Sequence, residues 1–340
     1  MIKVAVIGLG YFSQFHLTSW IDMAETQVIA ITDLDPARRN WATENFGVPV
    51  VDSVDAALIH NPQVVDIVAP PRAHAALIRA TLAPGRVIIC QKPFCISLEE
   101  ARAVTHEVEA AGARLVIHEN FRFQPWHRTI KSVLDSGRIG QVYSARFALR
   151  PGDGRGPNAY LDRQPAFQTM PRLLVHETGV HFIDLFCWLF GDATDVYADL
   201  RQLNPALQGE DAGTLILTHK SGAQSHFEGN RLADHATDAP RRTMGEMEII
   251  GEGGTLTLNG YGQIHFRPFG AETANLIPLI AQPDDSFGGG CVAALNAHVV
   301  AVLTGTGTLE NEAKDYLQVI ALSDLAYQSD TEGRKLPFNP

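Results

Sequence analysis

Cysteine and charged residues are both sparse in this chain of 340 residues. Charged residues make up 19% and hydrophobic residues 45%, which is enough apolar material for a substantial core without disulfides or metal. We expect reduced thiols, no bound metal and a cytoplasmic location, because the cysteines show neither the paired spacing of a metal site nor a dense disulfide framework. The four cysteines are Cys90, Cys95, Cys187 and Cys291.

Long apolar runs and basic runs are missing as well. The longest apolar stretches, such as residues 186–190, fall far short of a membrane span. Residues 1–7 form too short an apolar run before the first glycine to act as a signal peptide. With 27 Lys and Arg against 38 Asp and Glu, the net charge of −11 offers no electrostatic footprint for nucleic acid or an anionic membrane. We expect partners of neither kind.

The first third of the chain alternates short apolar runs with helical patterns. This alternation predicts an α/β fold with a doubly wound parallel sheet. The apolar runs predict six strands, at residues 2–7, 27–32, 48–51, 64–69, 86–90 and 114–118. The helical patterns between them cover residues 13–24, 36–46, 54–60, 73–82 and 98–111.

The pattern changes after about residue 120. Strand-like runs bounded by Gly or Asn predict a mainly antiparallel sheet, and the length favours two domains, residues 1–120 and 121–340. The strand-like runs cover residues 140–149, 195–200, 213–219, 223–228, 246–250, 255–258 and 263–267. Helices are expected at residues 124–136 and 177–190, from the three glycines at 288–290 through 303, and at 312–329.

A glycine loop follows the first predicted strand. The run Gly8-Leu9-Gly10-Tyr11-Phe12-Ser13 fits G-x-G-x-x-[small], with Ser13 in place of the usual third Gly or Ala. Gly8 permits a tight turn, Gly10 lets a pyrophosphate approach the backbone, and the next helix offers its N-terminal N–H groups. The alternative is a plain strand–helix turn.

Asp33 ends the second predicted strand, 20 positions after Ser13. A carboxylate at this place accepts hydrogen bonds from the adenosine ribose and repels a 2′-phosphate, which favours NAD over NADP. Arg38 and Arg39 weaken that preference, because arginines near this position can serve NADP. The alternative is that Asp33 only caps the helix that starts at Pro36.

Lys92 lies in Cys90-Gln91-Lys92-Pro93-Phe94, just past the fifth predicted strand. The carboxyl end of a parallel strand borders the cofactor crevice. An ammonium group there can hydrogen-bond the substrate oxygen, stabilise a developing alkoxide or share in proton transfer. The alternative is an ordinary solvated loop lysine.

A histidine between carboxylates marks the segment 176–184. Such a buried His is either a satisfied core residue or a tuned base. On an α-helix, spacings of 4, 3 and 4 predict one shared face for Glu177, His181, Asp184 and Trp188.

The order of these motifs along the chain resembles the glucose–fructose oxidoreductase and inositol dehydrogenase family (Gfo/Idh/MocA). The resemblance covers nearly the whole chain, and its motifs are specific in combination. They are the glycine loop, Asp33, Pro70-Pro71-Arg72-Ala73-His74, Gln91-Lys92-Pro93, Asn120-x-Arg122 and Glu177-x-Gly179-x-His181-x-x-Asp184.

The resemblance implies an N-terminal Rossmann domain and a C-terminal α/β domain with a large open sheet that often pairs subunits. It implies that Lys92 contacts substrate and nicotinamide, that His181 is the general base, and that Glu177 assists it. The expected cofactor contacts are Gly8, Gly10, Tyr11, Phe12, Asp33, Arg38, Pro70, His74, Gln91, Lys92 and Asn120. The expected substrate contacts are Lys92, Arg122, Arg163, Arg172 and His181.

Three positions depart from the family pattern. The lysine motif usually begins with Glu, and here Gln91 removes a charge that would stabilise protonated Lys92. Position 177 is more often Asp than Glu, and Thr-Pro-Asn is more usual than Pro70-Pro71-Arg72. Lys92 and His181 are both present, so the core chemistry is expected to be intact.

The loop of residues 158–172 is the expected substrate lid. Arg163 and Arg172 either pair with a substrate carboxylate or form ordinary surface salt bridges. The loop, together with Glu177-Thr178-Gly179, resembles the subgroup that contains D-apionate oxidoisomerase. That likeness implies a branched sugar-acid substrate, with oxidation coupled to isomerisation.

These observations predict an NAD-dependent oxidoreductase that acts on a hydroxyl of a sugar, polyol or sugar acid. A non-catalytic NAD-binding sensor of the same fold is the alternative, although a pure binder has no chemical need for both Lys92 and His181. A zinc-dependent dehydrogenase is disfavoured, because its ligands would have to cluster. An open sheet needs covering, so a homodimer or homotetramer is expected.

Overall fold

The computed structural model describes residues 1–339 and divides into two compact units. Unit 1 consists of Met1–Asn120 and Val292–Gln318. Unit 2 consists of Phe121–Cys291 and the chain from Val319 onward. Residues 292–318, which the sequence analysis assigned to the second domain, therefore make their contacts with the first part of the chain.

Unit 1 contains a five-stranded parallel sheet in the order β2-β1-β3-β4-β5. All four residues of β3 and of β4 are buried, as the continuous apolar runs predict for strands covered on both faces. The strands are β1 (Ile2–Ile7), β2 (Thr26–Thr32), β3 (Val64–Ile67), β4 (Val87–Cys90) and β5 (Arg114–Ile117).

The third predicted strand, at residues 48–51, is wrong. This segment forms only an isolated parallel bridge, between Ile31 and Val50. The backbone N–H of Ile31 donates to Pro49 at 2.9 Å, and that of Val51 donates to Ile31 at 3.0 Å. Proline has no N–H of its own to extend a ladder, so the run stops at one bridge.

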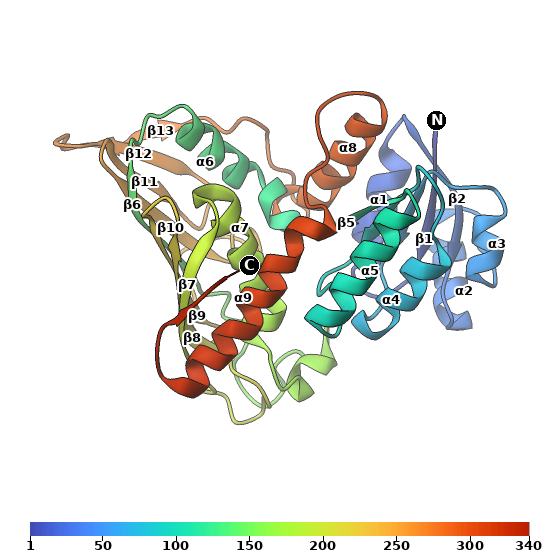
Figure 1. Cartoon of the computed structure of the whole chain (residues 1–340), viewed down its shortest axis with the longest axis horizontal. Helices are drawn as coiled ribbons and strands as arrows, with labels where there is room; N and C mark the ends of the chain where they lie inside the picture. Colours follow the sequence, from blue (N-terminus) through green and yellow to red (C-terminus); the bar gives the residue numbers. More distant parts are fainter. Residues whose placement is uncertain (340) are drawn as a thin grey trace. The chain divides into compact units, whose positions relative to one another are not determined.

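One helix of unit 1, α2 (Pro36–Phe46), starts and stops at residues that cap it. Asp35 accepts a hydrogen bond from the N–H of Ala37 at the start of α2, and Gly47 ends this helix in a left-handed conformation with φ +63°. In Figure 1, α4 and α5 lie side by side. The helices are α1 (Ser13–Asp22), α2 (Pro36–Phe46), α3 (Val54–Leu58), α4 (Pro71–Ala80), α5 (Leu98–Ala110) and α8 (Cys291–Leu303).

Unit 2 is built on a nine-stranded sheet in the order β13-β12-β11-β10-β6-β9-β8-β7-β14. The pair β6–β9 is parallel, and the other pairs are antiparallel. The strands are β6 (Val142–Leu149), β7 (Ala193–Arg201), β8 (Ala212–His219), β9 (Gln224–Asn230), β10 (Gly245–Gly251), β11 (Gly254–Leu258), β12 (Ile264–Pro268), β13 (Asn275–Ile277) and β14 (Leu336–Pro337).

One face of this sheet is covered by helices (Figure 1). Phe182 of α7 lies 4.0 Å from Phe147 of β6 and 5.0 Å from Phe227 of β9, measured between ring centroids. The end of α9 packs on β7, because Ser329 and Asp330 of the helix accept hydrogen bonds from the backbone N–H groups of β7. The further helical segments are α6 (Pro125–Asp135), α7 (Val180–Phe190), α9 (Ala313–Glu332), η1 (Asn120–Phe123), η2 (Pro165–Thr169) and η4 (Phe287–Gly289).

The helix expected to begin at Glu177 is preceded by a π-helical turn, η3 (Leu174–Gly179). The prediction of a single α-helix from residue 177 is therefore wrong, and α-helical spacing does not relate Glu177 to His181. π-Helical turns are rare and often lie at functional sites. Within the described residues, no helix is both long and apolar enough to cross a membrane.

Candidate active site

The loop between β1 and α1 brings two glycines beside the end of β3. Gly8 has φ +95°, and a Cβ at this residue would lie 2.5 Å from the carbonyl oxygen of Val68, so only glycine fits. Gly10 is exposed, and its Cβ would meet one atom within 4 Å, the same oxygen at 3.9 Å. The open backbone at Gly10 leaves room for a pyrophosphate. No side chain caps α1, so its N-terminal N–H groups suit a phosphate.

Asp33 is tied to this glycine loop. Its Oδ2 accepts a hydrogen bond from the backbone N–H of Leu9 at 2.7 Å, and its Oδ1 accepts one from Asp35 at 2.8 Å. Each carboxylate oxygen can accept a further bond, because one lone pair remains on it. The glycine loop, the uncapped helix and this half-buried carboxylate together fit the pyrophosphate and ribose of a dinucleotide.

Two arginines follow Asp33 on α2, and they differ in their contacts. Arg39 donates to the carbonyl of Asp33 at 2.7 Å and lies 3.6 Å from Asp52. The guanidinium of Arg38 lies 5.7 Å from the ring centroid of Trp41 and is partly exposed. Arg39 therefore contacts the backbone of Asp33, whereas Arg38 packs beside Trp41.

The remaining expected cofactor contacts in unit 1 differ in exposure. Tyr11 and Phe12 are partly exposed in the turn before α1, and Pro70 is exposed at the N-cap of α4. Asn120 is buried at the start of η1. His74 is fully buried.

The imidazole of His74 contacts main-chain oxygens. Its Nε2 lies 2.7 Å from the carbonyl of Ala69, and its Nδ1 lies 2.9 Å from that of Phe94. Burial lowers the pKa of His74. His74 therefore ties the turn after Lys92 to the segment that follows β3.

Gln91 and Lys92 form the turn that leaves β4. The backbone N–H of Lys92 donates to Oε1 of Gln91 at 3.2 Å, and Lys92 is half-buried. Gln91 is buried, and its Nε2 lies 2.7 Å from Nε2 of His16. The peptide bond between Lys92 and Pro93 is cis.

In unit 2, His181 lies at the start of α7 with its ring against Phe121. The two rings are parallel within 3°, with centroids 3.9 Å apart, and His181 is only 6% exposed. Stacking of this kind fixes the plane of the imidazole, so its ring nitrogens point in defined directions.

Asp184 forms a two-pronged ion pair with Arg122. The Nε of Arg122 donates to one carboxylate oxygen at 2.6 Å and Nη2 donates to the other at 2.5 Å. Asp184 is fully buried, and the guanidinium lies 5.9 Å from the ring centroid of Trp188. Arg122, expected to contact substrate, is thus fixed on a carboxylate of its own unit.

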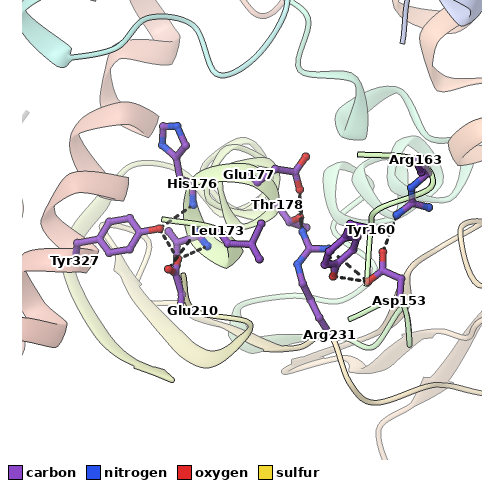
Figure 2. A network of polar contacts seen from close by, with 11 residues as sticks. Asp153, Tyr160, Arg163, Leu173, His176, Glu177, Thr178, Glu210, Arg231 and Tyr327 are labelled. Atoms are coloured by element: carbon purple, nitrogen blue, oxygen red, sulfur yellow. Dashed lines mark hydrogen bonds and ion pairs between the residues drawn. The ribbon is translucent and has the colours of Figure 1, made fainter. Parts of the chain in front are cut away.

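Glu177 is held by a buried arginine that the sequence did not point to (Figure 2). The Nη2 of Arg231 donates to Oε2 of Glu177 at 2.8 Å and also to Oγ1 of Thr178. Burial alone would lower the pKa of Arg231, but the acidic groups of Tyr160, Glu177 and Asp153 outweigh it and raise this pKa further. Glu177 is thereby paired with a permanent positive charge.

The same arginine reaches the predicted substrate loop. Tyr160 donates to Oδ1 of Asp153 at 3.0 Å, and Nη1 of Arg231 lies 3.5 Å from that oxygen (Figure 2). Arg163 donates to Oδ2 of Asp153 at 3.0 Å. Asp153 therefore joins the loop to Arg231, and through it to Glu177.

A second cluster holds the other end of the π-helical turn (Figure 2). Glu210 accepts hydrogen bonds at 3.1 Å from the backbone N–H groups of Leu173 and Val175, and also from the hydroxyl of Tyr327. That hydroxyl accepts one from the N–H of His176 at 3.1 Å.

Arg172 lies beside this second cluster. It pairs with Asp324 at 2.8 Å, and its guanidinium lies 4.4 Å from the ring centroid of Tyr327. About half of each side chain in the Arg172–Asp324 pair remains exposed.

Two protein-family models match this chain. Residues 2–119 match the model of an oxidoreductase family with an NAD-binding Rossmann fold (Gfo/Idh/MocA), and residues 127–257 match a C-terminal domain model of the same family. Over 98% of its length, the chain is 32% identical to D-apiose dehydrogenase of Paraburkholderia graminis, 88% of which it covers. The chain belongs to the Gfo/Idh/MocA family of oxidoreductases.

Two further proteins match over nearly the whole chain. D-Apiose dehydrogenase of Rhizobium rhizogenes is 30% identical over 98% of this chain and 96% of its own length. A crystal structure of an oxidoreductase from Agrobacterium radiobacter, in complex with NAD⁺, L-tartaric acid and magnesium, is similar with a TM-score of 0.88. It is 28% identical, and the match covers 99% of this chain and 98% of that one. Residues 1–339 of the present chain contain no cluster of three His, Cys, Asp or Glu suited to a metal ion.

Proposed function

We propose that this Gfo/Idh/MocA member is an NAD-dependent dehydrogenase that oxidises a hydroxyl of a sugar, with D-apiose as the first candidate substrate. The observation that carries the proposal is the glycine loop joined to Asp33 by the 2.7 Å hydrogen bond from Leu9. This arrangement supports a nicotinamide dinucleotide, and the Asp33 carboxylate favours NAD over NADP. The substrate candidate is supported by two relatives that are 32% and 30% identical over 98% of this chain, both D-apiose dehydrogenases.

Lys92 and His181 are the two residues that act on the reacting hydroxyl. NAD, when bound, accepts a hydride from the carbon that bears the hydroxyl. His181 takes the hydroxyl proton on a ring nitrogen, and Lys92 donates a hydrogen bond that holds the oxygen as it becomes a carbonyl. Glu177, charged and paired with Arg231 at 2.8 Å, assists His181. Gly10, Asp33 and the N-terminus of α1 hold the cofactor.

A neutral sugar is proposed before a sugar acid. The two arginines expected to recognise a substrate carboxylate already pair with carboxylates of the protein, Arg163 with Asp153 at 3.0 Å and Arg172 with Asp324 at 2.8 Å. A second carboxylate would have to share or displace these partners. D-Apionate, with oxidation coupled to isomerisation, is the acid to compare with D-apiose.

The role of His181 is tested with the variant His181→Ala. Loss of a general base lowers turnover by a factor of about 100 to 10,000. We expect a fall of at least about 100-fold in kcat, with the Kd for NAD unchanged in a fluorescence titration. The control is His265→Ala, because His265 lies on β12, outside the proposed site. If His181→Ala turns over like this control, His181 is not the base.

A further inference from the structure

A buried chain of hydrogen bonds lies behind the turn that carries Lys92. The Oδ2 of Asp66 accepts a bond from Nε1 of Trp20 at 2.7 Å and lies 2.7 Å from Nδ1 of His16. The other ring nitrogen of His16, Nε2, lies 2.7 Å from Nε2 of Gln91. Oε1 of Gln91 accepts the backbone N–H of Lys92 at 3.2 Å. Three side chains, Asp66, His16 and Gln91, thus connect β3 to the lysine turn.

The direction of every bond in this chain is fixed from its two ends. The backbone N–H of Lys92 can only donate, so the Gln91 atom that it contacts must be the oxygen. The other Gln91 atom is then the NH₂ group, which makes Nε2 of His16 an acceptor and places the proton on Nδ1. At the far end, Trp20 can only donate, so Oδ2 of Asp66 is an acceptor for both Trp20 and His16.

A second histidine fits the same directions. Nδ1 of His118 lies 3.4 Å from Nε2 of Gln91, where it can accept the other amide proton. The rings of His16 and His118 have centroids 4.1 Å apart. The amide nitrogen of Gln91 therefore donates toward two ring nitrogens, which a carboxylate at this position cannot do.

Asp66 is a costly residue in its position. It is fully buried in an otherwise apolar strand, and Oδ1 has no hydrogen-bond partner in the described part of the chain. A buried carboxylate with an unsatisfied oxygen destabilises a fold, and an aliphatic side chain in its place is often neutral or stabilising. Because this carboxylate does not stabilise the fold, its presence needs another explanation.

We propose that Asp66, acting through His16, is a positioning residue for Lys92. Asp66 fixes the His16 tautomer, which fixes the orientation of the Gln91 amide and so holds the backbone of Lys92. It also places a carboxylate in the buried network behind the turn. The inference rests on the role proposed for Lys92 above.

Reversing the donor and acceptor roles along this series of hydrogen bonds tests the inference. The variant Gln91→Glu requires His16 to donate in both directions, which creates a buried imidazolium between two carboxylates. The variant Asp66→Asn removes the charge. The double variant keeps one carboxylate in the network and reverses the bonds of His16, which donates from Nε2 to the new glutamate and accepts on Nδ1 from Nδ2 of the new asparagine. Because Nε1–H of Trp20 bonds the same oxygen of Asp66 and would face that amide group, Trp20→Phe is introduced into the parent and into every variant of this series.

Kinetics distinguish positioning from mere packing. We expect each single variant to lower kcat/KM for the sugar by about 10-fold or more, and the double variant to return to within about 3-fold of the parent, since residues in one network couple strongly. The buried polar control is Thr81→Val at the end of α4, whose kcat/KM should not change. If the losses of the single variants multiply in the double variant, Asp66 does not act through Gln91.

A spectroscopic measurement needs no turnover. In protein labelled with ¹⁵N at histidine, the signal absent from His16→Asn identifies residue 16, and we expect the Nδ1–H tautomer in the parent and the Nε2–H tautomer in the double variant. A parent His16 with the proton on Nε2 overturns the inference. If the parent oxidises no sugar while these tautomers are as expected, the proposed function fails and the hydrogen-bond assignment stands.

Discussion

Arg231 is the arginine with the least exposed side chain in any ion pair described, at 2%. Its replacement by Met removes the cation that Glu177 and Asp153 share, and breaking such a buried pair costs about 3–5 kcal/mol. We expect Arg231→Met to lower the melting temperature strongly in thermal denaturation. We expect Arg231→Lys to lose less stability but still lower kcat, because an ammonium lacks the two-pronged geometry.

The control for Arg231 is an exposed pair in the same unit. Arg146 contacts Glu228 at 3.3 Å, and the two side chains are 55% and 38% exposed. Exposed pairs contribute about 0–1 kcal/mol, so Arg146→Met should leave the melting temperature nearly unchanged. Equal stability of the Arg231 and Arg146 variants would contradict the role given to the buried cluster.

Asp33 is expected to set the choice between NAD and NADP. The variant Asp33→Asn keeps an oxygen to accept the N–H of Leu9 but removes the charge that repels a 2′-phosphate. We expect the ratio of kcat/KM for NAD over NADP to fall about 10-fold or more, since like charges at an interface cost several kcal/mol. Asp33→Ala, which also loses the bond to Leu9, should weaken binding of both cofactors. An unchanged ratio in Asp33→Asn would contradict the assignment.

The sequence predicts some of these residues and not others. Gly8, Gly10 and Asp33 stand at fixed intervals around one strand and one helix, so local spacing identifies them. Arg231 is placed in the site by its contact with Glu177, 54 positions away in the chain. Asp66 is placed in the network by its contact with His16, 50 positions away. No local pattern distinguishes a buried arginine after a strand from an ordinary exposed one.

At the scale of elements, α6 carries a histidine that limits stability in acid. His127 is fully buried, its Nδ1 lies 2.8 Å from the carbonyl of Phe121, and burial lowers its pKa to about 4 from the usual 6.5 of histidine. Between these values the unfolded chain takes up a proton that the folded chain does not. Stability therefore falls as the pH drops from 6.5 to about 4, by up to about 3 kcal/mol.

The variant His127→Asn tests this contribution, because its amide can still donate to Phe121 but does not titrate. We expect the free energy of unfolding, measured with urea, to fall less steeply for this variant than for the parent over that pH interval. Burial also lowers the pKa of His74 and His219, so some acid sensitivity remains in both proteins. Parallel pH profiles for parent and variant would contradict the pKa assigned to His127.

Most elements follow from periodicity, and the exceptions have non-local causes. The parallel strands of unit 1 and the alternating strands of unit 2 lie close to their predicted positions. The π-helical turn at 174–179 was not predicted, because Glu210 and Tyr327, which hold its backbone, come much later in the chain. The short strand at 336–337 pairs with β7 and has no pattern of its own to identify it.

At the scale of the whole molecule, the sequence predicts the α/β class and a parallel sheet followed by a mainly antiparallel one. It does not predict that residues 292–318 return to the first unit, since a helical pattern does not say which sheet the helix covers. The homodimer or homotetramer expected from the open nine-stranded sheet remains a prediction.

The central claim is that this chain oxidises a sugar with NAD. The most direct measurement is NADH formation, followed by absorbance, when the purified protein and NAD are mixed with D-apiose, D-apionate, other aldonates, other sugars or polyols, with NADP in parallel. We predict turnover with D-apiose, and more with NAD than with NADP. Binding of NAD without turnover on any member of the panel would contradict the claim and favour a non-catalytic sensor.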